Sequence, residues 1–397
     1  MSSTHAERIP AAILALSPHP WHGAWMNRQQ LLSRLGRQYA VLYSSGPFAT
    51  SDFGKASWAR ASWLGGYERT DNIILDRPPA LLPRAKHTPW LDRAMLTWIA
   101  ARWRHRLSRE GPRPCIGYVF HPKLWPLVRA ARPEVIVYHA YDVFRLQVGW
   151  NEKVARDERL LISRADIVLG SSDAICTELR SQGAQTPILV TNAADFNAYS
   201  NGLQQPEPPD LAAIPHPRLG YIGKISRKVD LELIARLAAA HPRWQFVFVG
   251  DPDSPDAESR TGVAGLRQQA NVHFLGFKHH TQLPAYASRM NVNLICHRLE
   301  QGLWTEGTFP LKLYEYLASG PPVVSSDIPS VRAHSDVIKI ASTPAEWEAH
   351  LTMALEAGPA GGGTAERQAV AAANTWDHRV TVIDQLLQRA LGDGGSH

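Results

Sequence analysis

The sequence has few cysteines and no long hydrophobic run. Its three cysteines are Cys115, Cys176 and Cys296, which are too widely spaced for a disulfide framework or a zinc site. This usage is typical of a reducing compartment such as the cytosol. The longest apolar runs fall far short of the roughly 20 residues that cross a bilayer. The run IPAAILALS leads directly to His19 and Trp21, so we interpret it as a first strand and not as a cleaved signal.

An even distribution of charge is also lacking. The chain has 42 Lys and Arg against 36 Asp and Glu. Residues 1–200 hold 25 of the basic and 16 of the acidic residues, a balance of +9, and the remaining 17 and 20 give −3. We therefore expect the N-terminal half to meet an anionic surface or an anionic acceptor. No nucleic-acid-binding motif or repeat of basic and aromatic residues occurs, which argues against a nucleic acid partner.

The length and the order of the apolar segments predict two domains. A chain of 397 residues exceeds one ordinary core. Strand patterns alternate with helix patterns, which is typical of doubly wound parallel α/β domains whose ligands gather at the carboxyl ends of the strands. We expect an N-terminal Rossmann-like domain over residues 1–201, a proline-rich linker over 202–217, a second domain over 218–364 and a C-terminal helix over 365–397.

Residues 50–110 combine tryptophans with arginines. The stretch LDRAMLTWIAARWRHRL predicts a helix that is apolar on one side and basic toward its end, at Arg102, Arg104 and Arg106. Such a helix can lie on an anionic membrane surface. It can equally be an ordinary domain helix with a solvated basic face. The remainder of residues 50–110 shows no clear element.

The segment TEGTFPLKLYEYLASGPPVVSSD predicts a helix followed by a buried strand. Thr308 is placed to cap the helix, and Pro310 fits its first turn. Lys312 puts a cation at the positive end of the helix dipole, where like charges repel. This placement becomes favourable when an anion binds there to Lys312 and to backbone N–H groups near Leu311. Glu315 shares a face with Lys312 and is well placed for the two hydroxyls of a ribose. The alternative is an ordinary ion pair on a solvated helix face.

A glycine turn with three cations follows another predicted strand. Gly223 is followed by Lys224, Arg227 and Lys228, and small residues with cations can wrap a diphosphate. The acidic run DPDSPD at 251–256 invites a metal interpretation, but we favour a loop and expect no metal.

The N-terminal half places polar side chains directly after its predicted strands. Some belong to the loop SPHPWHGAW after the first strand, where merely solvated histidines are an equal alternative. Others follow the strands near residues 115–120 and 135–138, so that all can reach the carboxyl edge of the sheet. These residues are His19, His22, Gly23, His121, His139, Tyr141 and Asp142.

The run PLKLYEYLASGPPVV resembles the sugar-nucleotide segment of GT-B glycosyltransferases near glycosyltransferase family 4, the group 1 transferases. VYHAYDVF, ADIVLGSSDAICTEL and ILVTNAADF resemble the N-terminal half of the same branch, with Asn192 and Asp195 at matching positions. The resemblance covers most of residues 11–48 and 115–391. It implies a GT-B fold, in which two Rossmann-like domains face each other across a cleft.

The resemblance also implies a donor site. Glu315 matches the Glu that holds the donor ribose, and Gly276 matches a position whose backbone meets the base. The commoner motif has another Glu eight residues earlier, where this chain has Gly307, and the neighbouring Glu306 is open as a substitute. The implied donor-binding residues are Gly223, Lys224, Arg227, Lys228, Gly276, Pro310, Leu311, Lys312 and Glu315.

The function so implied is transfer of a sugar from a nucleotide-diphosphate sugar to a hydroxyl acceptor, without cofactor or metal. Lys312 and the cations of the glycine turn would stabilise the leaving group. The resemblance implies retention at the anomeric carbon; an inverting enzyme would need a general base, for which Asp142, His139 and His121 are candidates. We expect a cytoplasmic protein in bacterial-type polysaccharide or glycolipid assembly. It would use a soluble or lipid-linked acceptor and contact the inner face of the membrane.

Two other functions stay open. A non-hydrolysing epimerase on the same fold would use one nucleotide sugar and no acceptor. A catalytically silent scaffold would use the basic helix to bind a membrane or a partner.

Overall fold

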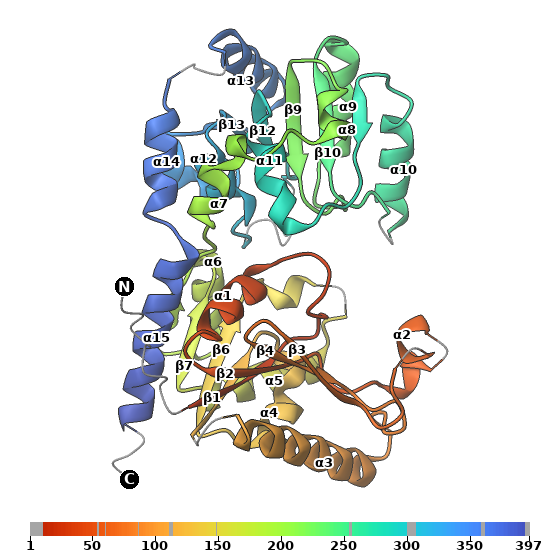
Figure 1. The fold of residues 1–397 in the computed structure, drawn as a ribbon, viewed down its shortest axis with the longest axis vertical. Coiled ribbons are helices and arrows are strands. Elements are labelled where there is room, and N and C mark those ends of the chain that lie inside the picture. The colour runs from red at the N-terminus through yellow and green to blue at the C-terminus, as the bar shows by residue number, and fades with distance from the viewer. Residues whose placement is uncertain are drawn as a thin grey trace. The chain divides into compact units, whose positions relative to one another are not determined.

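The computed structural model describes residues 11–53, 55–59, 61–85, 87–110, 114–147, 149–253, 256–299, 307–358 and 362–393. The chain divides into two compact units, which we call unit 1 (residues 1–190 and 379–397) and unit 2 (residues 191–378). Each unit is built on a largely parallel sheet with helices on both faces (Figure 1). No helix among the described residues is long and apolar enough to cross a membrane.

Unit 1 contains an eight-stranded sheet in the order β3-β4-β2-β1-β5-β6-β7-β8. All neighbouring pairs are parallel except β3 and β4. The strands are buried apolar runs, as expected for a parallel sheet covered on both faces. They are β1 Ala12–Leu16, β2 Ala40–Ser44, β3 Gly66–Thr70, β4 Ile73–Arg77, β5 Cys115–Val119, β6 Val135–Ala140, β7 Ile167–Gly170 and β8 Ile188–Leu189.

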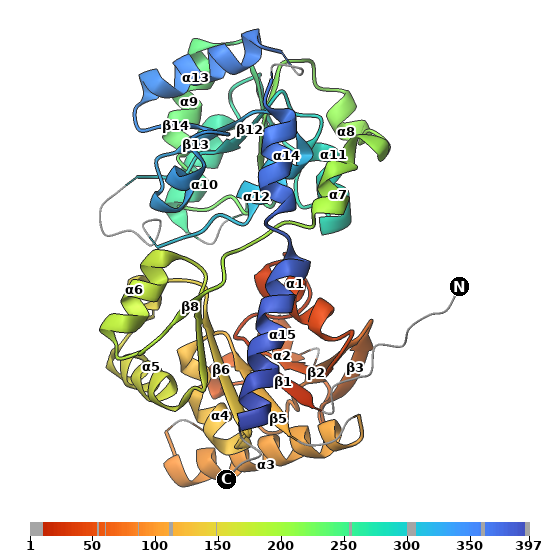
Figure 2. The same ribbon diagram turned by 90° about the vertical axis from the view of Figure 1, so that its left-hand side faces the viewer.

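The helices of unit 1 cover both faces of this sheet. One core joins α3, α4, α5 and α6 to side chains of the central strands, with Trp103 fully buried in it. Helices α1 and α15 lie together over the other face (Figure 2), where the Tyr39 hydroxyl donates a 2.7 Å hydrogen bond to Asp384. The helices are α1 Asn27–Leu35, α2 Ala56–Ala59, α3 Pro89–Ser108, α4 Trp125–Ala131, α5 Glu152–Arg164, α6 Asp173–Ser181 and α15 Trp376–Asp393.

The stretch with no clear predicted element contains a hairpin, β3–β4. Its two-residue turn places Asp71 at φ 50°, a conformation that Asp tolerates better than most residues. The helix predicted after it is confirmed as α3, but its basic end is not a free basic face. Arg102 bonds to the buried Asp76 at 2.7 Å, and Arg106 bonds to Glu110 at 2.7 Å.

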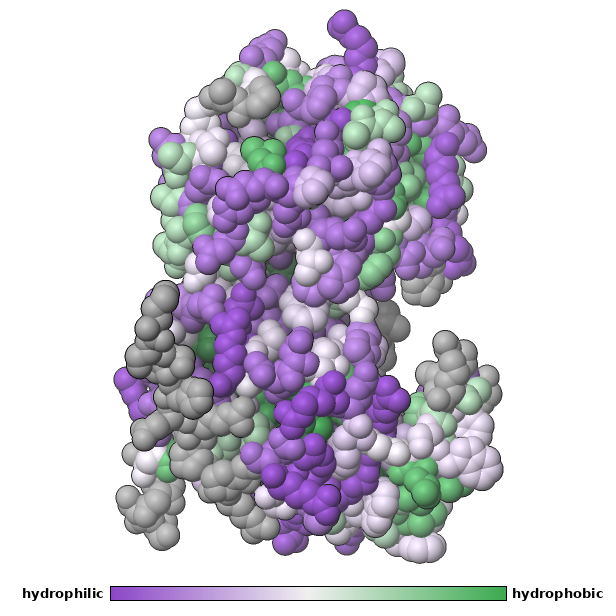
Figure 3. Space-filling view, in the orientation of Figure 1, coloured by the Kyte–Doolittle hydropathy of each residue, from purple (hydrophilic) through white to green (hydrophobic). Residues whose placement is uncertain are grey.

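Hydrophobic side chains are exposed instead. Trp63 and Leu64, near the start of the hairpin, are 72% and 79% exposed, and Trp90 and Trp98 of α3 are 73% and 44% exposed. Figure 3 shows hydrophobic residues gathered on the surface of this part of unit 1, below α2. We call Trp63, Leu64, Trp90 and Trp98 the apolar surface of unit 1.

Unit 2 contains a six-stranded parallel sheet in the order β11-β10-β9-β12-β13-β14. Separate cores fill its two faces, one with α7, α11, α12 and α14 and the other with α9, α10 and α13. The strands are β9 Arg218–Ile222, β10 Gln245–Val249, β11 Val272–Phe274, β12 Val292–Ile295, β13 Val323–Ser326 and β14 Lys339–Ala341. The helices are α7 Phe196–Ser200, α8 Pro209–Ala212, α9 Leu231–Ala240, α10 Ala257–Leu266, α11 Leu283–Ala287, α12 Lys312–Ser319, α13 Pro344–Glu356 and α14 Thr364–Ala372.

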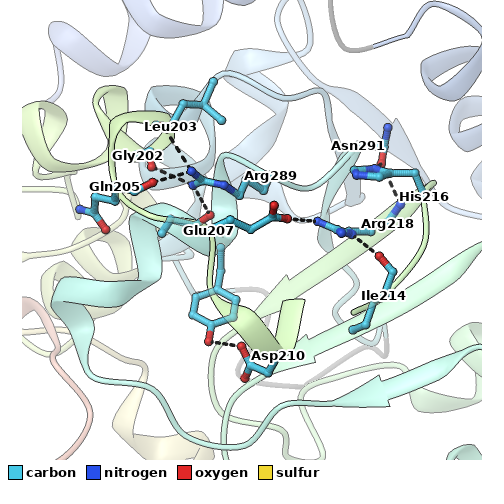
Figure 4. A network of polar contacts seen from close by, with 12 residues as sticks. Gly202, Leu203, Gln205, Glu207, Asp210, Ile214, His216, Arg218, Arg289 and Asn291 are labelled. Carbon is cyan, nitrogen blue, oxygen red and sulfur yellow. Dashed lines mark hydrogen bonds and ion pairs between the residues drawn. The ribbon is translucent and has the colours of Figure 1, made fainter. Parts of the chain in front are cut away.

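Residues 202–217 are not a linker. They form a 3₁₀ turn and α8 within unit 2, and Leu211 is fully buried. The guanidinium of Arg289 donates to the carbonyl oxygens of Gly202, Leu203 and Gln205, and Arg218 pairs with Glu207 at 2.8 Å (Figure 4). Both arginines come from outside the segment, so its own proline-rich composition gave no sign of them. The chain passes between the units at 190–191 and again at 378–379.

The predicted C-terminal helix is two helices, α14 and α15. Arg367 of α14 donates a 2.9 Å hydrogen bond to the carbonyl oxygen of Gly320, and Gln368 donates to that of Ala318 at 3.1 Å. Gly320 has φ 100° and ends α12, so α14 supplies donors to carbonyls at the end of that helix.

Candidate functional site

In unit 2 the strand order creates a switch point between β9 and β12. Strands β10 and β11 follow β9 on one side, whereas β12, β13 and β14 continue on the other. Ligands of open parallel sheets bind outside the carboxyl ends of the strands at such a point. The loop after β9 and the start of α12 therefore converge there, since a Cβ built on Gly223 would lie only 3.2 Å from Nζ of Lys312.

Gly223 begins the loop after β9 and requires glycine. Its φ is 141°, and a Cβ atom there would lie 3.2 Å from Nζ of Lys312. Its carbonyl oxygen would be 2.0 Å from a Cβ on Gly250, which follows β10. The two strand ends thus pack backbone against backbone, an approach that a side chain at Gly250 would prevent.

Lys312 is the first residue of α12. Its Nζ lies 4.0 Å from the centre of the Tyr221 ring, a cation–π contact. Burial lowers the pKa of Lys312 to about 8, although the charge of Glu315 raises it in part. The helix starts at Lys312, with Leu311 at the N-cap position where Thr308 was expected. The cation therefore stands directly at the positive helix end, which an anion would favour.

Glu315 lies one turn further along α12. Burial raises the pKa of its carboxyl to about 7, and a hydrogen bond from Tyr199 and the charge of Lys312 lower it in part. Tyr199 comes from α7, which Asp195 caps by accepting from the N–H of Ala198. The segment NAADF thus packs inside unit 2, and Tyr199 is a site neighbour that the sequence analysis missed.

The three cations of the glycine turn are not equivalent. Lys224 and Arg227 are exposed, and the Tyr221 hydroxyl donates to the carbonyl oxygen of Lys224 at 3.1 Å. Lys228 is only partly exposed, and its charge contributes to lowering the pKa of Lys312. The structure therefore brings Lys228, and not Lys224, into electrostatic contact with Lys312.

His297 is a second residue that the sequence analysis missed. It follows β12, is 6% exposed, and its carbonyl oxygen accepts a 2.6 Å hydrogen bond from Ser326. Burial, with the charges of Lys312 and Lys228, lowers its pKa well below the ordinary value. A neutral histidine therefore stands beside the cations. Its position just after the apolar stretch VNLIC was the available signal.

The other predicted donor residues surround this group. Gly276 has φ 71° and pairs with Gly250 beyond the end of β11. The carbonyl oxygen of Pro310 accepts from the N–H of Leu313 at 3.2 Å, and Leu311 has helical angles before α12 begins. Glu306 lies outside the described residues.

The acidic run at 251–256 has structural roles in its described parts. Asp251 accepts from the backbone N–H of Asp253 at 2.9 Å, and Asp256 caps α10 through Ser259 at 2.8 Å. Throughout the described ranges, no group of three or more His, Cys, Asp or Glu side chains is placed to hold a metal ion.

Unit 1 has its own switch point, between β1 and β5. His19, in the loop after β1, lies with its Nε2 3.2 Å from the Tyr141 hydroxyl, and its carbonyl oxygen accepts from Tyr43 at 2.6 Å. His22 and Gly23 of the same loop are exposed, and a Cβ on Gly23 would meet nothing within 4 Å. The structure thus unites His19 with Tyr141, and leaves His22 and Gly23 at the surface.

The three candidate bases differ in burial and bonding. His139 is 1% exposed, with its Nδ1 2.8 Å from the Tyr118 hydroxyl, and burial lowers its pKa to about 4. His121 accepts from the N–H of Lys123 at 3.1 Å, and burial lowers its pKa to about 3. Asp142 accepts from the N–H of Val143 at 2.9 Å and from Gln147 at 2.7 Å. His139 is thus a core residue, while His121 and Asp142 lie nearer the carboxyl edge of the sheet in unit 1.

Comparisons with known proteins agree with this arrangement. Residues 216–356 match the family described as Glycosyl transferases group 1. A curated relative, "Putative teichuronic acid biosynthesis glycosyltransferase TuaH" from Bacillus subtilis (strain 168), is 28% identical over 236 residues. That match covers 56% of this chain and only 58% of the relative.

Solved structures resemble the chain over nearly its whole length. Sucrose-phosphate synthase from Thermosynechococcus elongatus has a TM-score of 0.68 at 17% identity, covering 96% of this chain and 100% of that one. Anabaena HepE in complex with UDP and glucose has a TM-score of 0.68 at 16% identity, and the match covers 95% of this chain and 99% of that one. Trehalose 6-phosphate synthase from Burkholderia multivorans has a TM-score of 0.66 at 14% identity, covering 98% and 100%.

These findings confirm the predicted resemblance and the predicted fold. The chain is similar to the group 1 glycosyltransferases in sequence and has the GT-B fold.

Proposed function

We propose that this protein transfers a sugar from a nucleotide-diphosphate sugar to a hydroxyl acceptor. The observation that carries the proposal is the contact between Lys312, at the start of α12, and the glycine turn at Gly223, with Glu315 one helical turn away. A diphosphate can be bound by the Lys312 cation, by the N-terminus of α12 and by the backbone of the glycine turn. The Glu315 carboxylate, one helical turn further along, can accept hydrogen bonds from a ribose. The match of residues 216–356 to a glycosyltransferase family supports the same assignment.

Unit 2 is then the donor domain. Lys312 and Lys228 neutralise the diphosphate as its charge grows, Gly223 and Gly276 allow close backbone approach, and Glu315 accepts the ribose hydroxyls. Pro310 and Leu311 position the first turn of α12, while the exposed Lys224 and Arg227 close over the donor from the rim. The charge of the leaving group is met by protein cations, so no metal ion is required in this mechanism.

Unit 1 is the acceptor domain in this proposal. His19, His22, Gly23, His121 and Asp142 lie at or beyond the carboxyl ends of its central strands. The likeness to group 1 transferases supports retention at the anomeric carbon. If the reaction inverts, Asp142 is a better general base than His139, which lies in the core.

The acceptor belongs, in our proposal, to a cell-surface polysaccharide or glycolipid. The name of the Bacillus relative, which refers to teichuronic acid biosynthesis, supports this pathway class. We further propose peripheral contact with the inner face of the cytoplasmic membrane. The apolar surface of unit 1 supports it, because exposed tryptophans favour the interfacial region of a bilayer.

The test is turnover of a panel of nucleotide sugars, with and without acceptor extracts. Release of nucleoside diphosphate that depends on acceptor supports a transferase. Isomerisation of the donor in the absence of any acceptor would instead identify an epimerase. Absence of both, with no donor binding, would overturn the proposal in favour of a silent scaffold.

A further inference from the structure

A row of ring side chains crosses the carboxyl edge of the sheet in unit 1. Its members come from the end of β2 and from the loops after β1, β5 and β6, four neighbouring strands that include the switch point. We call it the aromatic row, and it consists of Trp21, Tyr43, His19, Tyr141, Phe144 and His121. Ligands of open parallel sheets bind at this edge. The aromatic row therefore lies where unit 1 is expected to meet its ligand.

The first half of the aromatic row links β2 to β6. The ring centres of Trp21 and Tyr43 lie 5.0 Å apart, edge to face. The Tyr43 hydroxyl donates a 2.6 Å hydrogen bond to the carbonyl oxygen of His19. Nε2 of His19 in turn lies 3.2 Å from the Tyr141 hydroxyl, and the two ring centres are 6.5 Å apart. His19 is thus fixed at its backbone by one tyrosine and at its imidazole by another.

The second half continues from Tyr141 to the loop after β5. The Tyr141 ring meets Phe144 edge to face at 5.2 Å, and Phe144 lies 4.4 Å from the ring of His121. The outer members of the aromatic row are buried, namely Trp21, Tyr43, Phe144 and His121. By contrast, His19 is exposed and Tyr141 is partly exposed. A buried aromatic base therefore holds two polar rings at the surface in one arrangement.

This surface pair combines two kinds of contact. The Tyr141 ring offers an apolar surface, and its hydroxyl has one donor and two acceptor positions, of which the bond with His19 uses one. A sugar ring matches both kinds, because its C–H groups gather on one face and its hydroxyls project from the rim. A hydrocarbon chain would cover the same hydroxyl and imidazole without offering them a hydrogen bond, which is unfavourable.

We propose that Tyr141 and His19 bind a sugar ring of the acceptor, with the Tyr141 ring against its C–H face and both polar groups bonded to its hydroxyls. The inference rests on the proposed function, because it assigns the acceptor side of that reaction. The acceptor class is then a glycan or glycoside whose terminal sugar receives the donor sugar. A lipid alcohol or lipid phosphate that accepts the first sugar of a chain is the alternative.

The test is saturation-transfer difference NMR on the full chain with UDP at saturation. The probes are methyl glucoside, methyl galactoside and methyl N-acetylglucosaminide, with decyl phosphate as a lipid-like comparator. We expect transfer to the ring C–H protons of at least one glycoside. Its affinity should fall about tenfold or more in Tyr141→Leu and about threefold in Tyr141→Phe, which keeps the ring. Tyr67→Leu is the matched control, since Tyr67 is another partly exposed tyrosine of unit 1, on β3.

The outcomes separate this inference from the proposed function. No transfer to any glycoside, or transfer that is unchanged in Tyr141→Leu, would overturn the inference while UDP binding stands. Binding of decyl phosphate alone, lost in Tyr141→Leu, would overturn it in favour of a lipid acceptor. If Tyr141→Leu does not fold, His19→Ala at an exposed position replaces it, with an expected loss of affinity of at least about threefold; an unchanged affinity there overturns the inference. Failure of UDP itself to bind would count against the proposed function.

Discussion

The side-chain amide of Asn192 donates a 2.7 Å hydrogen bond to the carbonyl oxygen of Phe309, 117 residues further along the chain. Asn192 belongs to the first segment of unit 2, and Phe309 lies three residues before Lys312. One buried bond therefore holds the approach to α12 against the segment that also contributes Tyr199.

Replacing Asn192 by Ala should loosen the start of α12. The Phe309 carbonyl would lose its donor in a buried position, which costs about 1–3 kcal/mol of unfolding free energy. UDP affinity should fall with it, because the first turn of α12 is no longer fixed. Chemical denaturation and calorimetric titration measure the two effects. Asn201→Ala, which removes an exposed bond to Asn197 and another from Gln204, is the control; equal losses in both variants would contradict this prediction.

Replacing Glu315 by Ala should weaken donor binding by about 1.5–3 kcal/mol, or ten- to a hundredfold, because two ribose hydroxyls lose their acceptor. The fold should persist. The sharper measurement compares UDP with deoxy-UDP: wild type should prefer UDP, and Glu315→Ala should bind the two nearly equally. A preference for ribose that survives the substitution would reduce Glu315 to a structural role.

Replacing Lys312 by Ala should lower kcat more than it raises KM, since the cation meets charge that grows in the transition state. We expect a loss of about 2–4 kcal/mol in kcat/KM, comparable to removing one oxyanion donor. Lys228→Ala should resemble it, and Lys224→Ala should be milder because Lys224 is exposed. A change in KM alone, or turnover abolished by EDTA and restored by Mn²⁺, would refute the metal-free leaving-group model.

Donor affinity should be highest between about pH 7 and 8. Glu315, with a pKa of about 7, accepts both hydroxyls only when ionised, so affinity should rise as pH rises through 7. Lys312, with a pKa of about 8, loses its charge above that value, so affinity should fall there. UDP titrations from pH 6 to 9 test this, and Glu315→Gln should abolish the rise alone. A flat profile in the wild type would contradict both assignments.

The same two groups should affect stability with opposite signs. The raised pKa of Glu315 means that the folded state holds a proton longer, so its contribution to stability falls as pH rises from about 4.5 to 7. The lowered pKa of Lys312 means that its contribution rises from about pH 8 to 10.5. Chemical denaturation at a series of pH values measures the free energy of unfolding. Glu315→Gln should abolish its fall between about pH 4.5 and 7, and bound UDP should reduce its rise between about pH 8 and 10.5.

Membrane contact should depend on the apolar surface of unit 1. Trp63→Ser with Trp90→Ser should reduce sedimentation with anionic vesicles several-fold, because two exposed tryptophans are lost. Arg102→Gln is an informative contrast, since it should lower stability through the loss of the Asp76 pair and leave vesicle binding of the folded fraction unchanged. Unchanged vesicle binding after the double Trp substitution would contradict this proposal.

The periodic parts of the fold could be predicted from sequence. The first strand expected in IPAAILALS is β1, Ala12–Leu16, and the helix expected in LDRAMLTWIAARWRHRL is α3, Pro89–Ser108, because the apolar pattern of each is buried in a simple layer. The turn of the hairpin β3–β4 lacks an Asn-Gly pair, so the sequence pattern did not predict a hairpin there. Residues 202–217 appeared to be a linker because the contacts of Arg218 and Arg289 that hold them arise only in the folded chain and leave no mark on the composition of the segment.

The residues of the candidate site could likewise be predicted only in part. Lys312 and Glu315 could be singled out because their spacing on one helix is local. Tyr199 could not, since it reaches the site only through the packing of α7, and His297 had only its position after a strand as a signal, because its approach to Lys312 depends on the order of β9 and β12. His139 was expected just after a strand, but β6 extends to Ala140 and includes it, and sequence could not show that Tyr118 and Phe120 lie against its ring.

Unit 1 is discontinuous in the chain, and this bears on synthesis from the N-terminus. Val380, Ile383 and Leu387 of α15 are buried, and the bond between Tyr39 and Asp384 joins the first part of the unit to its last. A ribosome completes every residue of unit 2 before it delivers this helix. Until then the side chains of unit 1 against which α15 packs stay exposed, so we expect unit 1 to reach its native state last, although it is made first.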